Sequence, residues 1–247
     1  MIPRRVFLAA VLLSFVVPAL LSAQQLADAQ SRREAIQHYR VGQEFFSAEK
    51  FDRAAEEFTK ATAKDPLFTL AHYQTGQSYM NLKRYASAIK AFKDCLQASS
   101  TLYGLAETDR FAVEKQRDDE IHEMRESVKA LQQAGHTLQV TRAEQHLSDL
   151  EKQRTSLNGG YRPPAEVLLS LGSAFFRNGD REAAETEWKA AIDVNPKLGE
   201  AHNNLAVIYM TSGRYKEADA EVKAAEKTGF RVNPQLKEDL KKAAAGR

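Results

Sequence analysis

The chain has 247 residues, of which 28% are charged and 43% are hydrophobic, with 12 Gly and 7 Pro. This composition excludes wholesale disorder, a collagen-like chain and a multi-span membrane protein. A single Cys excludes a disulfide framework and a cysteine-rich zinc site. The net charge is +2, and it falls to zero when Arg4 and Arg5 are removed with the N-terminal segment described next. A nucleic-acid binder normally shows a basic excess or stripe, so we expect no nucleic-acid partner.

Residues 1–23 have the order of a secretory signal peptide. A basic start precedes an apolar run over 6–21, and a small residue, Ala23, ends the segment. We expect cleavage after Ala23, so that the chain touches the membrane only transiently and is exported to the periplasm or secreted. An uncleaved anchor is the alternative, but the run has about 16 residues where a span needs about 20.

Two export routes stay open. The run Arg4-Arg5-Val6-Phe7-Leu8 resembles the core of a twin-arginine signal, which carries folded proteins. The strongly apolar run that follows favours the general secretory (Sec) route. Residues 24–34 then form a short N-terminal linker.

A period of 34 residues runs through most of the remaining chain. Self-similarity at this spacing is typical of solenoid arrays built from helix pairs. The in-phase copies span 35–68, 69–102, 165–198 and 199–232. Equivalent residues 34 positions apart are Gly42 and Gly76, Ala54 and Ala88, Phe58 and Phe92, Gly172 and Ala206, Ala184 and Ala218, and Trp188 and Val222.

Each copy resembles a tetratricopeptide repeat (TPR), with the order L-G-x2-Y, A-x3-F, P. The first copy reads Val41-Gly42-x2-Phe45, Ala54-x3-Phe58, Ala61, Pro66, and the third reads Leu171-Gly172-x2-Phe175, Ala184-x3-Trp188, Ala191, Pro196. The fourth copy departs most, because Val222 replaces the aromatic residue. The resemblance implies an all-α, right-handed superhelical solenoid of antiparallel helix pairs. It also implies a non-enzymatic protein that binds other proteins.

Residues 103–164 interrupt the period. The spacing of their apolar residues predicts two long antiparallel helices, over about 106–133 and 137–157. We expect an elongated helical hairpin, or a degenerate extended repeat, that projects from the solenoid by about 21 Å. A charged helical linker that packs on nothing is the alternative. The apolar seam consists of Ile121, Met124, Val128 and Leu131 on the first helix and Leu147, Leu150 and Leu157 on the second.

Residues 233–247 are expected to form a capping helix and tail. Asn233 is a good N-cap and Pro234 suits the first helical position, so the helix should run to about Ala245. Its polar composition is typical of the last helix of a repeat array.

Residues with reactive side chains have simpler structural interpretations. His38, His72 and His202 occupy equivalent places in three repeats, which we interpret as packing positions rather than a metal site. Cys95 takes a small-residue position and is expected to be a buried thiol. The run Asp118-Asp119-Glu120 is interpreted as a solvated helix face. We expect no catalytic residue, no cofactor and no metal.

A stripe on the first helix of each repeat is the candidate binding site. In TPR proteins the equivalent positions line a concave groove. None of these residues is charged, so the pattern predicts a neutral groove for an apolar or amide-rich peptide segment. A carboxylate clamp is not expected, because Gln43 and Gln77 stand where its cations would be. The stripe consists of Tyr39, Gln43, Phe46, Tyr73, Gln77, Met80, Leu169, Ser173, Phe176, Asn203, Val207 and Met210.

The resulting hypothesis is an exported protein-interaction scaffold or adaptor of the bacterial cell envelope, with a monomer favoured. The alternative is a structural or self-assembling envelope spacer that acts through the seam of the central hairpin.

Overall fold

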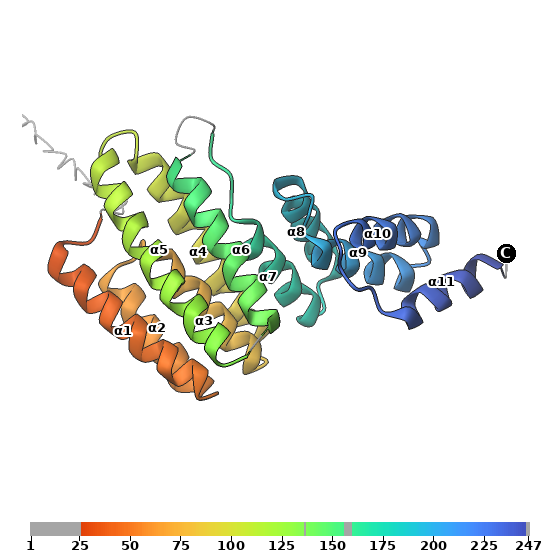
Figure 1. The fold of residues 1–247 in the computed structure, drawn as a ribbon, viewed down its shortest axis with the longest axis horizontal. Helices are drawn as coiled ribbons and strands as arrows, with labels where there is room; N and C mark the ends of the chain where they lie inside the picture. The colour runs from red at the N-terminus through yellow and green to blue at the C-terminus, as the bar shows by residue number, and fades with distance from the viewer. Residues whose placement is uncertain (1–25, 136, 156–159, 246–247) are drawn as a thin grey trace, which may run out of the picture.

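The computed structural model describes residues 26–135, 137–155 and 160–245. Within these ranges the chain forms eleven α-helices and no strand (Figure 1). The expected signal peptide over 1–23 lies outside the described residues. The helices are α1 (Ala29–Ser47), α2 (Phe51–Lys64), α3 (Thr69–Asn81), α4 (Tyr85–Leu105), α5 (Arg110–Gln133), α6 (Thr137–Thr155), α7 (Ala165–Arg177), α8 (Arg181–Val194), α9 (Gly199–Thr211), α10 (Tyr215–Lys227) and α11 (Pro234–Ala245).

Four helix pairs form the repeats, namely α1 with α2, α3 with α4, α7 with α8, and α9 with α10. The packing within each pair follows from its small and aromatic residues. A Cβ atom added to Gly76 would lie 2.5 Å from Phe92 Cε1, and one on Gly172 would lie 2.5 Å from Trp188 Cδ1. Only glycine therefore allows the aromatic ring to lie flat against the partner helix. The all-α solenoid of antiparallel helix pairs is confirmed.

The third repeat stacks directly on the second, although 62 residues separate them in the sequence. Helix α7 packs on α4. Val167 and Leu171 of α7 share one apolar cluster with Tyr73 and Phe92 of the second repeat. The four repeats therefore form one continuous array, and the segment between them is an insertion.

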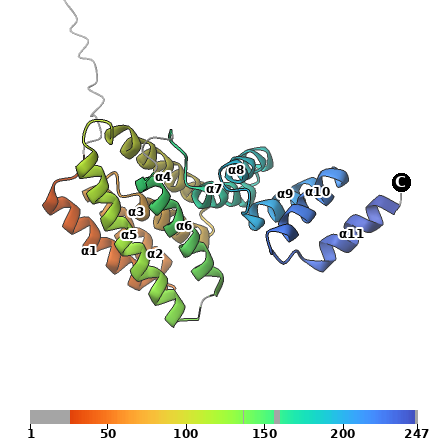
Figure 2. The same ribbon diagram turned by 45° about the horizontal axis from the view of Figure 1, so that its top comes forward.

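The expectation that the hairpin projects from the solenoid is wrong. Helices α5 and α6 fold back along the repeats, and Figures 1 and 2 both show them lying over α1 and α3. Ile121, Met124 and Leu150 of the seam are buried in the same cluster as Tyr39 and Phe58. In a projecting hairpin the seam could pack only between its own two helices, whereas the concave face of the first two repeats offers it further apolar partners.

The array ends with α11, which begins at Pro234. Asn233 caps this helix, because its Oδ1 accepts a hydrogen bond from the Gln235 amide at 2.9 Å. Leu240 packs into the cluster of the last two repeats. No helix among the described residues is long and apolar enough to cross a bilayer.

Candidate partner-binding groove

The hairpin covers the part of the predicted groove that belongs to the first two repeats. Tyr39 is fully buried, and its ring packs on Phe58 and Phe68. The Gln43 side-chain amide donates hydrogen bonds to the Tyr39 hydroxyl and to Ser127 of α5. Two residues that were predicted to meet a partner therefore contact the chain's own hairpin.

A second contact of this kind involves α6. The ring of His146 meets the ring of Tyr73 edge-on, with 4.5 Å between centroids. Gln77 donates to the Tyr73 hydroxyl at 2.8 Å and to Ser170 of α7 at 3.1 Å. The predicted stripe is thus a continuous surface in the structure, and the hairpin lies on its N-terminal half.

Glu120 of α5 joins the hairpin to the start of α3. Phe68 occupies the N-cap position of α3 and has no side chain that could cap it. The Glu120 carboxylate instead accepts the Thr69 amide at 3.0 Å and the Thr69 hydroxyl at 2.6 Å. Arg117 donates to the same carboxylate at 3.1 Å. A carboxylate at this place also interacts favourably with the helix dipole.

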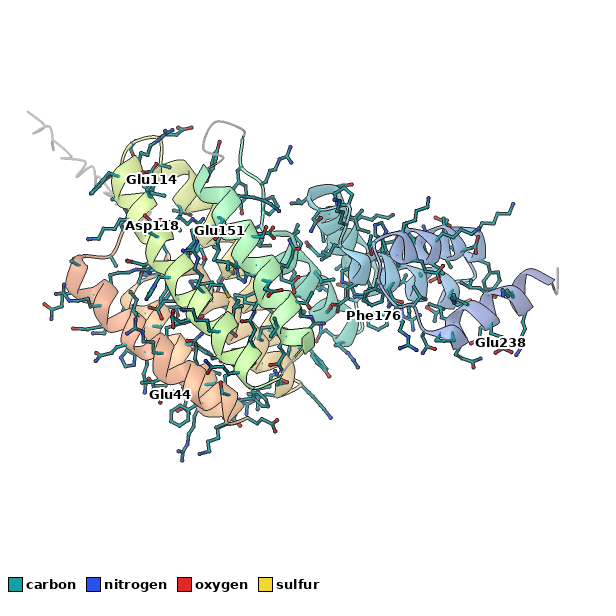
Figure 3. All side chains as sticks on the ribbon, in the orientation of Figure 1. Glu44, Glu114, Asp118, Glu151, Phe176 and Glu238 are labelled. Atoms are coloured by element: carbon teal, nitrogen blue, oxygen red, sulfur yellow. The ribbon has the colours of Figure 1, made fainter. Side chains whose placement is uncertain are left out.

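The interpretation of Asp118-Asp119-Glu120 as a solvated face is therefore wrong for Glu120. That side chain is fully buried, whereas Asp118 is exposed on the outside of the hairpin (Figure 3). The difference arises because α5 turns Glu120 toward the repeats.

Asp149 of α6 caps the start of α7, as Glu120 caps the start of α3. The N-cap residue of α7 is Pro164, which makes no side-chain cap. Asp149 Oδ2 accepts the Ala165 amide at 3.1 Å. Burial raises the pKa of Asp149, although Lys152 and the hydrogen bonds to its carboxylate oppose this effect.

Ion pairs join the hairpin to α1 and α9 as well. Arg40 donates two hydrogen bonds to Glu123, at 2.7 and 3.1 Å. Arg142 of α6 donates two to Glu200 of α9, at 2.5 and 3.3 Å. The hairpin is therefore held to the first helix of every repeat.

Two buried polar groups under the hairpin are incompletely paired. Neither ring nitrogen of His146 has a hydrogen-bond partner among the residues that the structure describes, and burial lowers the pKa of this histidine to about 3. Glu166 Oε1 has no partner either. Burial raises the pKa of Glu166 to about 8; Arg142 opposes this shift, and the nearby carboxylates Glu200 and Asp149 add to it.

The groove stays open beyond the hairpin. Two adjoining hollows share Gln77, Met80, Arg142 and Arg177, and so form one groove. The hollow over α7 and α9 has a volume of about 320 Å³ and is lined by Leu169, Ser170, Ser173, Phe176, Trp188, Glu200, Asn204 and Val207 besides the shared residues. The hollow between α3 and the hairpin tip has a volume of about 450 Å³ and is lined by Phe46, Tyr73, Gln74, Asn81, Lys83, Tyr85, Met124, Ser127, Gln139 and Ala143 besides the shared residues.

Most of the predicted stripe lines this groove. Phe176 lies between the hairpin-covered repeats and the last repeat (Figure 3). Asn203 and Met210 are half-buried on α9 and line neither hollow. The charged residues Lys83, Arg142, Arg177 and Glu200 were missed, because they lie at helix ends or on the hairpin, outside the stripe.

The histidines and the cysteine are structural. His38 Nδ1 lies 2.7 Å from Glu57 Oε2, and His202 Nδ1 lies 2.6 Å from Glu221 Oε2. His72 Nε2 lies 2.9 Å from the Pro66 carbonyl oxygen. Cys95 is buried, its thiol donates to the Thr69 carbonyl at 3.3 Å, and burial raises its pKa. These contacts agree with the packing interpretation.

A family model for the tetratricopeptide repeat matches residues 39–102 and 169–229, which together make up half of the chain. The chain belongs to the tetratricopeptide repeat family. The matched ranges leave out α5 and α6, as expected for an insertion. Proteins of this family are generally scaffolds for protein–protein interaction, and the match identifies this chain as a TPR scaffold of that kind.

Curated relatives match only parts of this TPR protein. The photosystem I assembly protein Ycf3 of Rippkaea orientalis is 37% identical over 78 residues, which cover 28% of this chain and 45% of the relative. A protein O-mannosyl-transferase, F38B6.6, of Caenorhabditis elegans is 35% identical over 57 residues, which cover 23% of this chain and 8% of the relative. The chain thus spans less than half the length of either relative.

Solved structures of other TPR proteins are similar to this chain at low sequence identity. PilW, a type IV pilus biogenesis factor, is 15% identical with a TM-score of 0.42, over 85% of this chain and 86% of PilW. TTC0263, a TPR protein of Thermus thermophilus, is 21% identical with a TM-score of 0.34, over 85% of this chain and 99% of that protein.

Proposed function

We propose that this TPR protein is an exported, non-enzymatic adaptor of the bacterial cell envelope. It binds a segment of a partner protein in the groove that runs from the hairpin tip over α7 and α9. The proposed export rests on the basic, apolar and small-residue order of residues 1–23, which lie outside the described part of the chain.

The observation that carries the binding proposal is the open groove beside the docked hairpin. The docked hairpin supports this proposal, because α6 lies along the stripe at Tyr73 as a helical segment of a partner would. The remaining groove continues that surface over α7 and α9. Phe176 and Val207 supply apolar area there, and Ser173 and Asn204 supply polar groups. Concave sites with apolar walls and a few polar groups are typical binding sites.

A structural spacer that self-assembles through the hairpin is less well supported. Such a spacer needs the hairpin seam to be free for a second copy. Met124 and Leu150 are almost completely buried against the protein's own repeats. The adaptor needs no such rearrangement.

Photo-crosslinking in cells tests the groove. A photo-reactive phenylalanine analogue is placed at Phe176, and crosslinked products are identified by mass spectrometry. The matched control is the same analogue at Phe111, which is 79% exposed at the start of α5 and outside the groove. We expect one envelope protein to be captured from Phe176 and not from Phe111.

Two other results would speak against the proposal. Capture of the same protein from both positions would show that the groove is not the site. Only self-crosslinks from Phe176 would favour the structural spacer. Fractionation of the same cells tests the export, because the adaptor should be found outside the cytosol without residues 1–23.

A further inference from the structure

The hairpin adds a wall to the groove that the repeats alone do not supply. The hollow of about 450 Å³ has α3 on one side and the tip of the hairpin on the other, with Met124 and Ser127 from α5 and Gln139 and Arg142 from α6. We call this hollow the hairpin pocket. The hairpin pocket therefore needs both a repeat and the inserted hairpin.

The charged residues that line the hairpin pocket are all cations. They are Lys83 after α3, Arg142 on α6 and Arg177 at the end of α7. No carboxylate from the described part of the chain lines the pocket. Charges of one sign within a concave site concentrate the field and attract ligands of opposite charge.

Two of these cations are available to a ligand. Arg142 is paired with Glu200. Lys83 and Arg177 are exposed and form no ion pair within the described ranges. The Lys83 backbone forms the tight turn between α3 and α4, with φ +58°, which brings this residue to the rim of the pocket. The pocket therefore has an uncompensated positive charge.

The other lining residues favour an apolar side chain beside that charge. Phe46, Met80, Tyr85 and Met124 form an aromatic and Met-rich wall. Methionine side chains adapt to ligands of irregular shape. The pocket thus combines cations with a deformable apolar surface.

We propose that the hairpin pocket binds an acidic side chain that neighbours an aromatic or aliphatic side chain within an internal segment of the partner protein. The inference rests on the proposed function and specifies the partner's chemistry. Lys83 and Arg177 bind the carboxylate, and the wall of Phe46, Met80 and Met124 binds the apolar neighbour. Arg142, held by Glu200, keeps the hairpin wall in place.

Selection from a random library of 12-residue peptides on phage tests this proposal. Constant Gly-Ser linkers flank each peptide on both sides, so that no free carboxy terminus is presented. The target is the purified protein. We expect enriched peptides to carry Asp or Glu within two positions of Phe, Tyr, Leu or Met.

Charge variants locate the bound peptides. Lys83→Gln and Arg177→Gln should each weaken an enriched peptide about tenfold, as expected when a hydrogen bond to a charged group is lost. Arg181→Gln is the matched control, because Arg181 is exposed at the start of α8 and lines neither hollow. It should leave the affinity unchanged. Circular dichroism confirms that the variants are folded.

The outcomes separate this inference from the proposed function. One outcome overturns the inference but leaves the proposed groove intact. In that outcome the enriched peptides lack acidic residues, bind the Phe176→Glu variant more weakly, and bind the Arg177→Gln variant as well as the parent. Enriched acidic peptides that respond equally to Arg181→Gln would overturn the inference as non-specific attraction. No enrichment at all would overturn the inference, and absence of crosslinks from Phe176 would then also refute the groove.

Discussion

Replacing Glu166 by Gln should stabilise the protein at alkaline pH and have little effect at acid pH. Glu166 lies in the first turn of α7, almost completely buried beneath α6, and its Oε1 has no hydrogen-bond partner. Burial raises its pKa from 4.5 to about 8. Between these values the native state holds a proton that the unfolded state has lost, so stability falls as the pH rises.

The size of the effect follows from the same two values. The difference between 4.5 and about 8 corresponds to roughly 5 kcal/mol once the pH exceeds 8. Relaxation and water penetration reduce such penalties in real proteins. We therefore expect Glu166→Gln to be about 2 to 4 kcal/mol more stable than the parent at pH 9, relative to the comparison at pH 5.

Urea unfolding monitored by circular dichroism at five or six pH values between 4 and 9 measures this difference. Glu182→Gln is the control, because Glu182 lies in the first turn of α8 and is exposed. Its stability should follow the parent at every pH. If Glu166→Gln keeps the parent's slope between pH 5 and 9, then Glu166 is already ionised in the folded protein and our account of its burial is wrong.

His146 should lower the free energy of unfolding at acid pH. Burial lowers its pKa from 6.5 to about 3. Below pH 6.5 the unfolded chain therefore binds a proton that the native state does not bind. This group removes stability as the pH falls through that window. Because Glu166 acts in the opposite direction above 4.5, the combined contribution of these two groups to stability is greatest between about pH 4.5 and 6.5.

Four further substitutions probe the packing. Glu120→Ala removes the cap of α3 and leaves Arg117 without its buried partner, so it should cost about 3 to 5 kcal/mol in urea unfolding; a loss below 1 kcal/mol, within the range of an exposed site, would contradict the capping role. Gly76→Ala should lower the free energy of unfolding by about 1 to 3 kcal/mol, because the added methyl group overlaps the Phe92 ring. Gly104→Ala is the comparison: Gly104 lies on a helix with open space around it, so this variant should raise the free energy of unfolding by about 0.5 to 1 kcal/mol. Glu49 has φ +58° in the turn where the third and fourth repeats have glycine. Glu49→Gly should relieve about 1 kcal/mol of backbone strain and so raise the midpoint of thermal unfolding. A lower midpoint would show that the turn is not strained.

The repeats could be predicted from the sequence because their geometry is local. Gly42 and Phe58 are sixteen residues apart in one helix pair, so their spacing alone encodes the contact between them. The two hairpin helices could be predicted for the same reason, since Ile121 and Met124 fall at helical spacing. Their observed bounds differ by a few residues from the expected ones, with α5 beginning at Arg110.

The position of the hairpin could not be predicted, because it depends on pairings between distant residues. The uncharged stripe containing Tyr39 and Gln43 fits a partner's segment or the chain's own hairpin equally well. Glu120 looks like any charged residue on a solvated helix until Thr69, 51 positions earlier, is placed beside it. The N-cap residues gave no signal either, because Lys50, Arg84, Leu198 and Arg214 precede other helices without capping them, just as Phe68 and Pro164 do.

The docked hairpin changes how the array should fold. In a simple solenoid each repeat touches only its neighbours, and unfolding can proceed from either end one repeat at a time. Here Arg40 reaches across 83 residues to Glu123, and Arg142 reaches across 58 to Glu200. These long-range bonds join α1 through α9 into one cooperative unit. The backbone amide hydrogens of this unit should exchange with solvent through a single unfolding event, whereas α11 should unfold independently with a smaller free energy.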